Sequence, residues 1–479
     1  MSNDAELHEL SAHALAQRFA ERTLTPSEYA EHVLARVAQW EPSINAMATL
    51  DPDSVRRQAE DATQRWARGA ALSAIDGVTV TLKEMIPAAG ATVPLGSAAT
   101  QPQPGSVDSP VAARLREAGA VVLGRTTVPD FGILAAGISS LYGTTRNPWN
   151  PAFNTGGSSS GTAAAAAACY GPLHVGTDIG GSIRIPSAWC GLVGFKPSNG
   201  RIPIDPYYMG RCAGPMTRTV DDAALMMRYL AQPDGRDATS LPPQRIDWDA
   251  MPTEVRGLRV GLLLDAGFGL EPAAEVASAV RAAAALFEAH GARVVEVAPV
   301  LTPQAMEGLN HFWQARFWGD LERLPEQQRA RALPYLLEWA AEGARVTGVQ
   351  ALRGFQSMYE VRANAARLFQ DVDLVLSPTN PTLPFPAEWA SPVNDPRQPF
   401  VHVAHTVPWN IGEQPAVSIN CGFTREGMPI GLQIVGPRFA DAPVLAWAKA
   451  YEGWRGPVRN WPRSPSDLAA VSAAREGAQ

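Results

Sequence analysis

The sequence has few cysteines, no run of 20 apolar residues and no block of like charges. Its four cysteines, Cys169, Cys190, Cys212 and Cys421, show no C-x-x-C spacing. In a chain of this length we expect such cysteines to be reduced and partly buried, as in a cytoplasmic protein. The N-terminal MSNDAELHEL has no basic flank and no apolar core, so no secretory signal is expected there.

Charge and hydropathy exclude two classes of partner. The net charge is −7 and charged residues make up 18% of the chain, without an acidic or basic cluster, so neither nucleic acid nor an anionic membrane surface is an expected partner. The apolar runs are interrupted before the roughly 18 residues that a membrane-spanning helix needs.

Several catalytic motifs are also missing. There is no G-x-x-x-x-G-K-[ST], which argues against a nucleotide site, and no H-E-x-x-H or H-x-H, so we expect no metal and no cofactor. Residues 157–161, GSSSG, formally match the G-x-S-x-G elbow of α/β-hydrolases. That elbow needs a preceding strand, and residues 147–155, NPWNPAFNT, are not predicted to form one.

Alternating strand and helix patterns predict an α/β fold with a sheet covered by helices. We expect helices over 5–40 (two, the second from Thr25), 53–68, 109–118, 162–168, 220–230, 272–290 and 302–370, and a last helix capped by Asp441. We expect strands over 78–83, 120–124, 172–176, 258–264, 293–297, 373–377, 416–419 and 431–435. Residues 139–157 and 201–215 are predicted to be loops.

The most informative stretch, residues 154–186, reads NTGGSSSGTAAAAAACYGPLHVGTDIGGSIRIP. Two glycine-rich turns flank an alanine helix, and glycine permits backbone conformations that bring the chain close to a reacting group. Ser158 and Ser182 lie in these turns, and Lys83 ends an apolar strand upstream. From its local sequence, Lys83 is most simply interpreted as a lysine at the edge of the sheet whose amine reaches into water. If it is buried instead, a lowered pKa would let it act as a base for a serine nucleophile.

These motifs resemble those of the amidase signature family. GGSSSG, the alanine run, GTDIGGSIRIP, GLVGFKP at 191–197 and GMPIGLQIVG at 427–436 all match its pattern, closely over 70–220 and loosely over the whole chain. The resemblance implies one domain over 1–479, a mixed twisted β-sheet surrounded by α-helices. Within it we expect N-terminal helices at about 5–68, a signature core at about 70–220 and a variable substrate-pocket region at about 300–365.

The resemblance also implies roles for individual residues. Ser182 would be the nucleophile that forms an acyl-enzyme, Ser158, after a cis peptide bond, would pass protons, and Lys83 would be the base. The oxyanion hole would consist of the backbone N–H groups of Ile179, Gly180, Gly181 and Ser182.

Four further residues are expected to support the site. Ser159, like Ser160, is expected to cap the alanine helix, Thr177 and Asp178 to orient the turn, and Arg184 to hold the loop. Many relatives have Asp and then Asn after the lysine, whereas this chain has Glu84 and Met85. We therefore expect the local support of Lys83, or the access to it, to differ.

The implied activity is hydrolysis of a carboxylic amide to an acid and an amine. The alternatives are the amidase subunit of a glutamine-dependent tRNA amidotransferase and an inactive scaffold. The aromatic residues between 312 and 359 favour core packing over a substrate wall, but they also point to an aryl or apolar acyl group. The N-terminal helices are a candidate surface for a homodimer.

Overall fold

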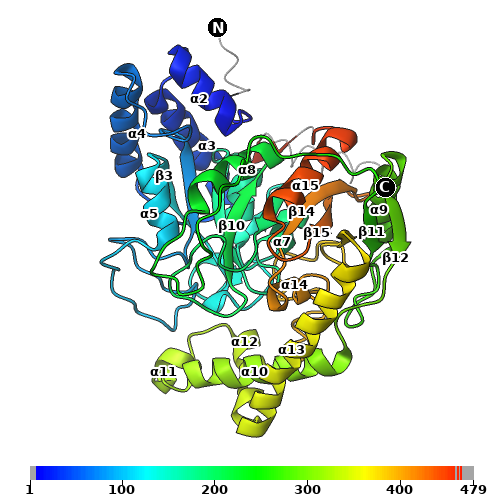
Figure 1. The fold of residues 1–479 in the computed structure, drawn as a ribbon. Coiled ribbons are helices and arrows are strands. Elements are labelled where there is room, and N and C mark those ends of the chain that lie inside the picture. The colour runs from blue at the N-terminus through cyan, green and yellow to red at the C-terminus, as the bar shows by residue number, and fades with distance from the viewer. Residues whose placement is uncertain (1–6, 459–460, 463, 466–479) are drawn as a thin grey trace, which may run out of the picture.

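A mixed β-sheet forms the centre of the molecule (Figure 1). The computed structural model describes residues 7–458, 461–462 and 464–465. In this part of the chain an 11-stranded sheet has the strand order β1-β3-β2-β8-β10-β9-β14-β15-β13-β11-β12. Its strands are β1 (Met47–Leu50), β2 (Thr79–Lys83), β3 (Val121–Thr126), β8 (Leu173–Asp178), β9 (Val193–Lys196), β10 (Cys212–Thr217), β11 (Arg259–Leu262), β12 (Arg293–Glu296), β13 (Leu374–Pro378), β14 (Ala416–Phe423) and β15 (Pro429–Val435).

Helices surround this sheet, as the α/β prediction requires. They are α2 (Ala12–Glu21), α3 (Pro26–Ile44), α4 (Pro52–Ala67), α5 (Pro110–Glu117), α6 (Ser160–Ala167), α7 (Arg184–Trp189), α8 (Val220–Leu230), α9 (Ala274–Ala289), α10 (Pro303–Leu321), α11 (Glu326–Arg329), α12 (Pro334–Ala341), α13 (Gly348–Asp371), α14 (Pro408–Ile411) and α15 (Asp441–Arg455). Among the helices of the described residues, none combines the length and the apolar character that a bilayer crossing requires.

Local signals fix where several helices begin. Thr25 and Glu28 form a capping box at the start of α3, and Pro26 occupies its first turn. Asp51 accepts from the Ser54 N–H at the start of α4. The predicted helical start at residue 5 lies outside the described residues, and α2 begins at Ala12.

The strand register brings the chemically interesting residues to one edge of the sheet. β2 runs parallel to both β3 and β8, with Leu82 opposite Val175. The carboxyl ends of parallel strands lie on the same side, so Lys83 at the end of β2 lies near the turn that follows Asp178 at the end of β8. The predicted strands at 416–419 and 431–435, now β14 and β15, belong to the same sheet as β2.

The helices α10 to α13 form a group below the sheet in the view of Figure 1. Their buried side chains pack with residues 134–138 and 400–407 in one apolar cluster, which includes Leu309, Phe317 and Trp339. The backbone N–H of Leu333 donates to the buried carboxylate of Asp130 at 3.0 Å. This group therefore covers the sheet edge at which Lys83 lies.

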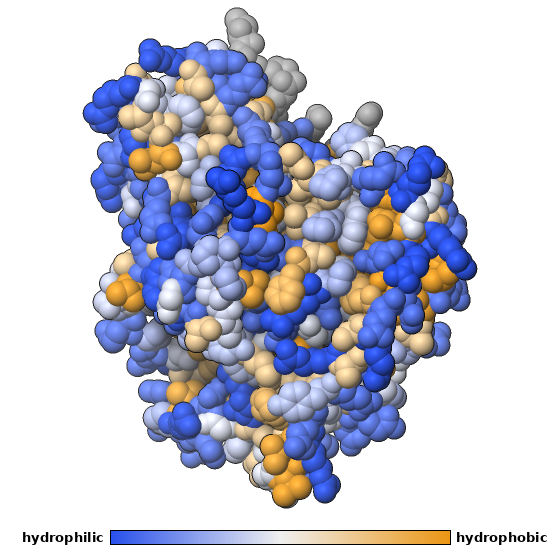
Figure 2. Space-filling view, in the orientation of Figure 1, coloured by the Kyte–Doolittle hydropathy of each residue, from blue (hydrophilic) through white to orange (hydrophobic). Residues whose placement is uncertain are grey.

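The outer surface on the face drawn in Figure 2 is largely hydrophilic. Strongly hydrophobic residues appear there as small patches with hydrophilic residues between them (Figure 2). Scattered apolar residues of this kind are normal on the surface of a folded protein.

Three local predictions were wrong. Residues 150–154 form a short strand, β7 (Asn150–Asn154), paired with β6 (Arg146–Asn147), and β4 (Ile138–Ser139) pairs with β5 (Gly143–Thr144) in the same predicted loop. The predicted loop 201–215 ends in β10, whose Cys212 pairs with Asp178. The sequence of β10, CAGPMT, contains few β-branched residues. Its extended conformation depends instead on pairing with β8 on one side and β9 on the other.

The third concerns the cap of the last helix. Asp441 does not cap α15. Its carboxylate instead accepts from the N–H of Ser198 and from Arg201. A local helix signal was therefore overridden by contacts from distant sequence.

Candidate active site

Lys83 is a buried lysine at the end of a central strand. Its side chain is 1% exposed. The amine Nζ donates to Ser158 Oγ at 2.8 Å and to the carbonyl oxygen of Thr177 at 3.3 Å. Burial lowers the pKa of Lys83 well below its usual value, the charge of Arg211 lowers it further, and Asp178 and Glu84 act in the opposite direction. The interpretation of Lys83 as an edge lysine with its amine in water is therefore wrong. With a lowered pKa, its amine is suited to accept a proton.

Ser158 stands in the first glycine turn, directly before α6. The peptide bond between Gly157 and Ser158 is cis, as expected. Alanines on α6 are fully buried and contact β2, β8 and β10, so the helix is fixed against the strands that carry the other groups. The small side chains permit this close approach.

Neither neighbouring serine caps α6 with its side chain, contrary to expectation. Ser159 Oγ donates to the carbonyl of Thr177 at 3.2 Å and accepts from the Thr177 N–H at 3.3 Å. Ser160 Oγ donates to the carbonyl of Thr127. Ser159 and Thr177 thus tie the first glycine turn to β8.

The second glycine turn is shaped by the carboxylate of Asp178. It accepts from the N–H groups of Gly181 at 2.8 Å and Ile183 at 3.1 Å. Gly181 was one of the four predicted oxyanion donors, but its N–H is already bonded to the Asp178 carboxylate and does not face a substrate as a free donor. The N–H groups of the other three predicted donors, Ile179, Gly180 and Ser182, have no acceptor within residues 7–458.

Ser182 is partly exposed, and its hydroxyl has no hydrogen-bond partner in the part of the chain that the structure describes. Its carbonyl accepts from the Ser159 N–H at 3.1 Å, which joins the two glycine turns. Ser182 lines the same cavity as Ser158 and Lys83. No hydrogen bond joins the hydroxyls of Ser158 and Ser182; Ser158 Oγ is bonded to Lys83 instead.

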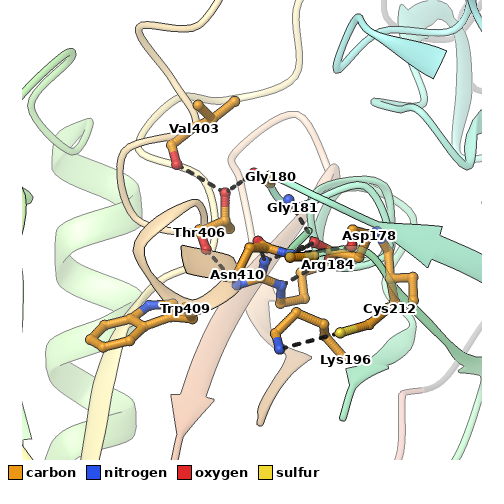
Figure 3. Close-up of polar contacts among 12 residues, drawn as sticks. Asp178, Gly180, Gly181, Arg184, Lys196, Cys212, Val403, Thr406, Trp409 and Asn410 are labelled. Atoms are coloured by element: carbon orange, nitrogen blue, oxygen red, sulfur yellow. Dashed lines mark hydrogen bonds and ion pairs between the residues drawn. The ribbon is translucent and has the colours of Figure 1, made fainter. Parts of the chain in front are cut away.

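Arg184 and Asp178 form a fully buried ion pair behind this turn (Figure 3). Arg184 donates to the Asp178 carboxylate at 2.9 and 3.0 Å, to Thr406 O and Gln433 Oε1 at 2.9 and 2.7 Å, and to Asn410 Oδ1 at 2.6 Å. Burial acts to raise the pKa of Asp178, but the charge and hydrogen bonds of Arg184 outweigh it and hold that pKa well below its usual range. The loop is therefore held rigid, as predicted for Asp178 and Arg184.

Sequence reasoning missed three members of this network. Thr406 Oγ1 donates to the carbonyl of Gly180 at 2.6 Å, and Asn410 Nδ2 donates to the Asp178 carboxylate at 2.9 Å. Gln433 lies in the predicted strand GLQIV. A glutamine in an apolar strand could have indicated a buried polar network, because a buried amide needs hydrogen-bond partners. Thr406 and Asn410 stand in a segment whose local sequence gives no such signal.

Glu84 and Met85, which depart from the family pattern, lie beside Lys83. Glu84 is buried and accepts from the Gly96 N–H at 2.9 Å, while Arg125 donates to its carbonyl. Burial raises the pKa of Glu84. Met85 lines the cavity shared by Lys83 and Ser182. Glu84 therefore supports the end of β2, and Met85 forms part of the cavity wall beside it.

Two cavities meet at Ser182. One has an apolar wall that includes Ile133, Ile185, Trp313, Trp339, Phe400 and Val403. The other contains Lys83, Ser158 and Thr177 together with charged groups, Arg211, Arg316 and Asp320. The aromatic residues of α10 and α12 thus serve both as core and as cavity wall.

In the described residues, no group of three or more His, Cys, Asp or Glu side chains is arranged to hold a metal ion.

Comparison with known proteins finds relatives over nearly the whole chain. A model of the Amidase family matches residues 28–445. The chain is 34% identical to an acylamidase of Rhodococcus erythropolis, over 98% of this chain and all of that protein. It is 33% identical to a glutamyl-tRNA(Gln) amidotransferase subunit of Chloroflexus aggregans, over 97% of this chain and 99% of that one.

Among solved structures, a bacterial aryl acylamidase of the amidase signature family superposes with a TM-score of 0.86. It shares 28% sequence identity and covers 95% of this chain and 97% of its own.

Proposed function

The chain belongs to the amidase signature family and is a hydrolase of linear carboxylic amides, and on this basis we propose that it works through an acyl-enzyme on Ser182. The observation that carries the proposal is the 2.8 Å hydrogen bond from the buried Lys83 amine to Ser158, in a cavity that also holds Ser182. Serine is too weak an acid to attack unaided, so it needs this base.

The first step is a proton relay. Neutral Lys83 takes the proton of Ser158, Ser158 takes that of Ser182, and Ser182 Oγ attacks the amide carbon. Ser182 has to turn its hydroxyl toward Ser158, a rotation about one single bond that substrate binding would favour. The negative charge on the carbonyl oxygen is stabilised by the free N–H groups of Ile179, Gly180 and Ser182.

The second step releases the amine. As the C–N bond breaks, Ser158 gives its proton to the leaving nitrogen and takes one back from Lys83, which becomes neutral again. The same relay then takes a proton from water, which attacks the ester, and Ser182 recovers its proton as the acid leaves. Because Ser158 must reach the leaving nitrogen, the amine part belongs in the cavity that holds Ser158 and Lys83. The acyl part therefore belongs in the apolar cavity, which supports an aryl or apolar acyl group.

The test is hydrolysis of N-acyl arylamides by the purified chain. Ser182→Ala is expected to abolish turnover of every amide, whereas the matched change Ser54→Ala on α4 should leave it unchanged. Turnover retained in Ser182→Ala would refute the acyl-enzyme.

A second candidate function is that of a tRNA amidotransferase subunit, because full-length relatives of that kind are 33% identical. Such a protein would work inside a complex, whereas the proposed steps use only groups of this chain and water. Robust hydrolysis by the chain alone, without ATP, favours the stand-alone amidase. Activity that appears only with partner proteins and ATP would favour the alternative.

A further inference from the structure

Arg211 is a buried arginine without a carboxylate partner. It precedes β10 and is 8% exposed. Its guanidinium donates to the carbonyl oxygens of Pro206 at 3.1 Å and Met85 at 2.9 Å. Among the described residues no carboxylate forms an ion pair with it, and the exposed Asp205 acts on it only through space. Two neutral carbonyls thus fix a full positive charge in place.

This charge lies on the cavity that holds the proposed catalytic groups. Arg211 and Met85 line it together with Lys83, Ser158 and Ser182. One of the two anchors, Met85, is only two residues from Lys83, so the guanidinium is held beside the end of β2.

The other charged groups around Lys83 are already engaged. Asp178, at the end of β8, is paired with Arg184, and Glu84 accepts a backbone N–H and has a raised pKa. Arg316 and Asp320, on α10, line the same cavity and pair with each other at 3.4 Å. Tyr208 lies beneath the guanidinium of Arg316, 4.4 Å from it.

We propose that Arg211 is a positioning residue that acts through Lys83: its fixed charge keeps the neighbouring amine in the neutral form that can accept a proton. This rests on the proposed role of Lys83 as base. A protonated amine beside an unpaired guanidinium would place two positive charges on one partly desolvated cavity, and like charges disfavour each other. The pKa of Lys83 agrees, since after burial the charge of Arg211 is the next largest cause that lowers it.

The test is the pH dependence of kcat/KM for an N-acyl arylamide. Activity needs neutral Lys83, so it falls on the acid side as the amine becomes protonated. Arg211→Gln removes the charge and keeps a donor for the carbonyls. We expect it to move the acid-side midpoint up by about one pH unit, which is about a tenfold loss of kcat/KM below both midpoints. Well above them, its activity should approach that of the wild type.

Two controls separate charge from structure. Arg211→Lys keeps the charge and is expected to keep the wild-type midpoint. Arg281→Gln removes an exposed charge on α9 and should leave the whole profile unchanged.

Two results would overturn the proposal. One is a loss of kcat/KM in Arg211→Gln that is the same at every pH, with an unchanged acid-side midpoint. The other is a raised acid-side midpoint in Arg211→Lys, and this result counts even if Arg211→Gln does not fold. A wild-type chain that hydrolyses no amide would refute the proposed function instead, and this inference with it.

Discussion

Replacing Arg184 by Met tests whether the loop that carries Ser182 is held by its buried ion pair. Methionine is of similar length but carries no charge. The change removes five hydrogen bonds, two of them to Asp178, and leaves that carboxylate buried without its cation.

The expected loss of stability follows from the groups that remain. Breaking a buried ion pair on one side typically costs about 3–5 kcal/mol. In the variant, Asp178 still accepts hydrogen bonds from the N–H groups of Gly181 and Ile183 and from the side-chain amide of Asn410. We therefore expect a loss at the lower end of this range, about 3 kcal/mol. We also expect kcat to fall at least about tenfold, because the turn that places the oxyanion donors loses its anchor.

The pH dependence has a defined sign. In the wild type the pKa of Asp178 is held below its usual value, so its contribution to stability is present above the unfolded-state pKa and is lost only in strong acid. Without Arg184 that pKa rises, and protonation relieves the unpaired charge. The difference in the free energy of unfolding between the wild type and Arg184→Met should therefore be largest near pH 7 and become smaller toward pH 4.

Urea unfolding followed by tryptophan fluorescence measures this difference. Arg281→Met, at an exposed site, should stay within about 0.5 kcal/mol of the wild type. An Arg184→Met protein within about 1 kcal/mol of the wild type at pH 7, with unchanged kcat, would refute the reasoning.

Further substitutions test other parts of the account. Lys83→Met should lower kcat/KM by about 10⁴ while the circular dichroism spectrum stays unchanged. Thr406→Val removes the 2.6 Å hydrogen bond to Gly180 and should lower kcat about tenfold with little change in KM, as steady-state kinetics would show. Trp313→Ala enlarges the apolar cavity and should shift preference toward bulkier acyl groups in a panel of amides with one amine. Burial raises the pKa of Asp222 to about 6, so Asp222→Asn should raise the thermal midpoint more at pH 8 than at pH 5.

The sequence predicted most strands of the central sheet and drew attention to Lys83, Ser158 and Ser182 because those signals are local. A β-branched strand ending in Lys83, two glycine turns and an alanine helix each leave a short, readable pattern. The structure then places Lys83, Ser158 and Ser182 on one cavity. Their catalytic roles, the single-domain division, the homodimer and the cytoplasmic location stay predictions.

What the sequence could not provide depends on contacts between distant segments. Cys212 becomes part of a strand because it pairs with Asp178 of β8, and the far end of the same strand pairs with β9. Asp441 was expected to cap a helix, but it binds Arg201, 240 residues away. The expected cap Ser159 binds Thr177 instead, because α6 and β8 are packed together.

The sequence also could not show which backbone N–H groups of the second glycine turn are free to act as oxyanion donors. Four consecutive amides were predicted from one turn, but the Asp178 carboxylate lies where it takes the N–H of Gly181. Which amides stay free depends on the turn geometry rather than on its composition. The charge of Arg211 on the same cavity is likewise visible only once β10 is folded against β8.

The central claim is that Ser182 is the nucleophile, and covalent labelling of that serine tests it most directly. The purified chain is treated with a fluorophosphonate, digested and analysed by mass spectrometry, beside Ser182→Ala and Ser54→Ala. The account predicts a single adduct on the peptide containing Ser182 in the wild type and in Ser54→Ala, and none in Ser182→Ala. An adduct on another residue, or labelling that persists in Ser182→Ala, would contradict it.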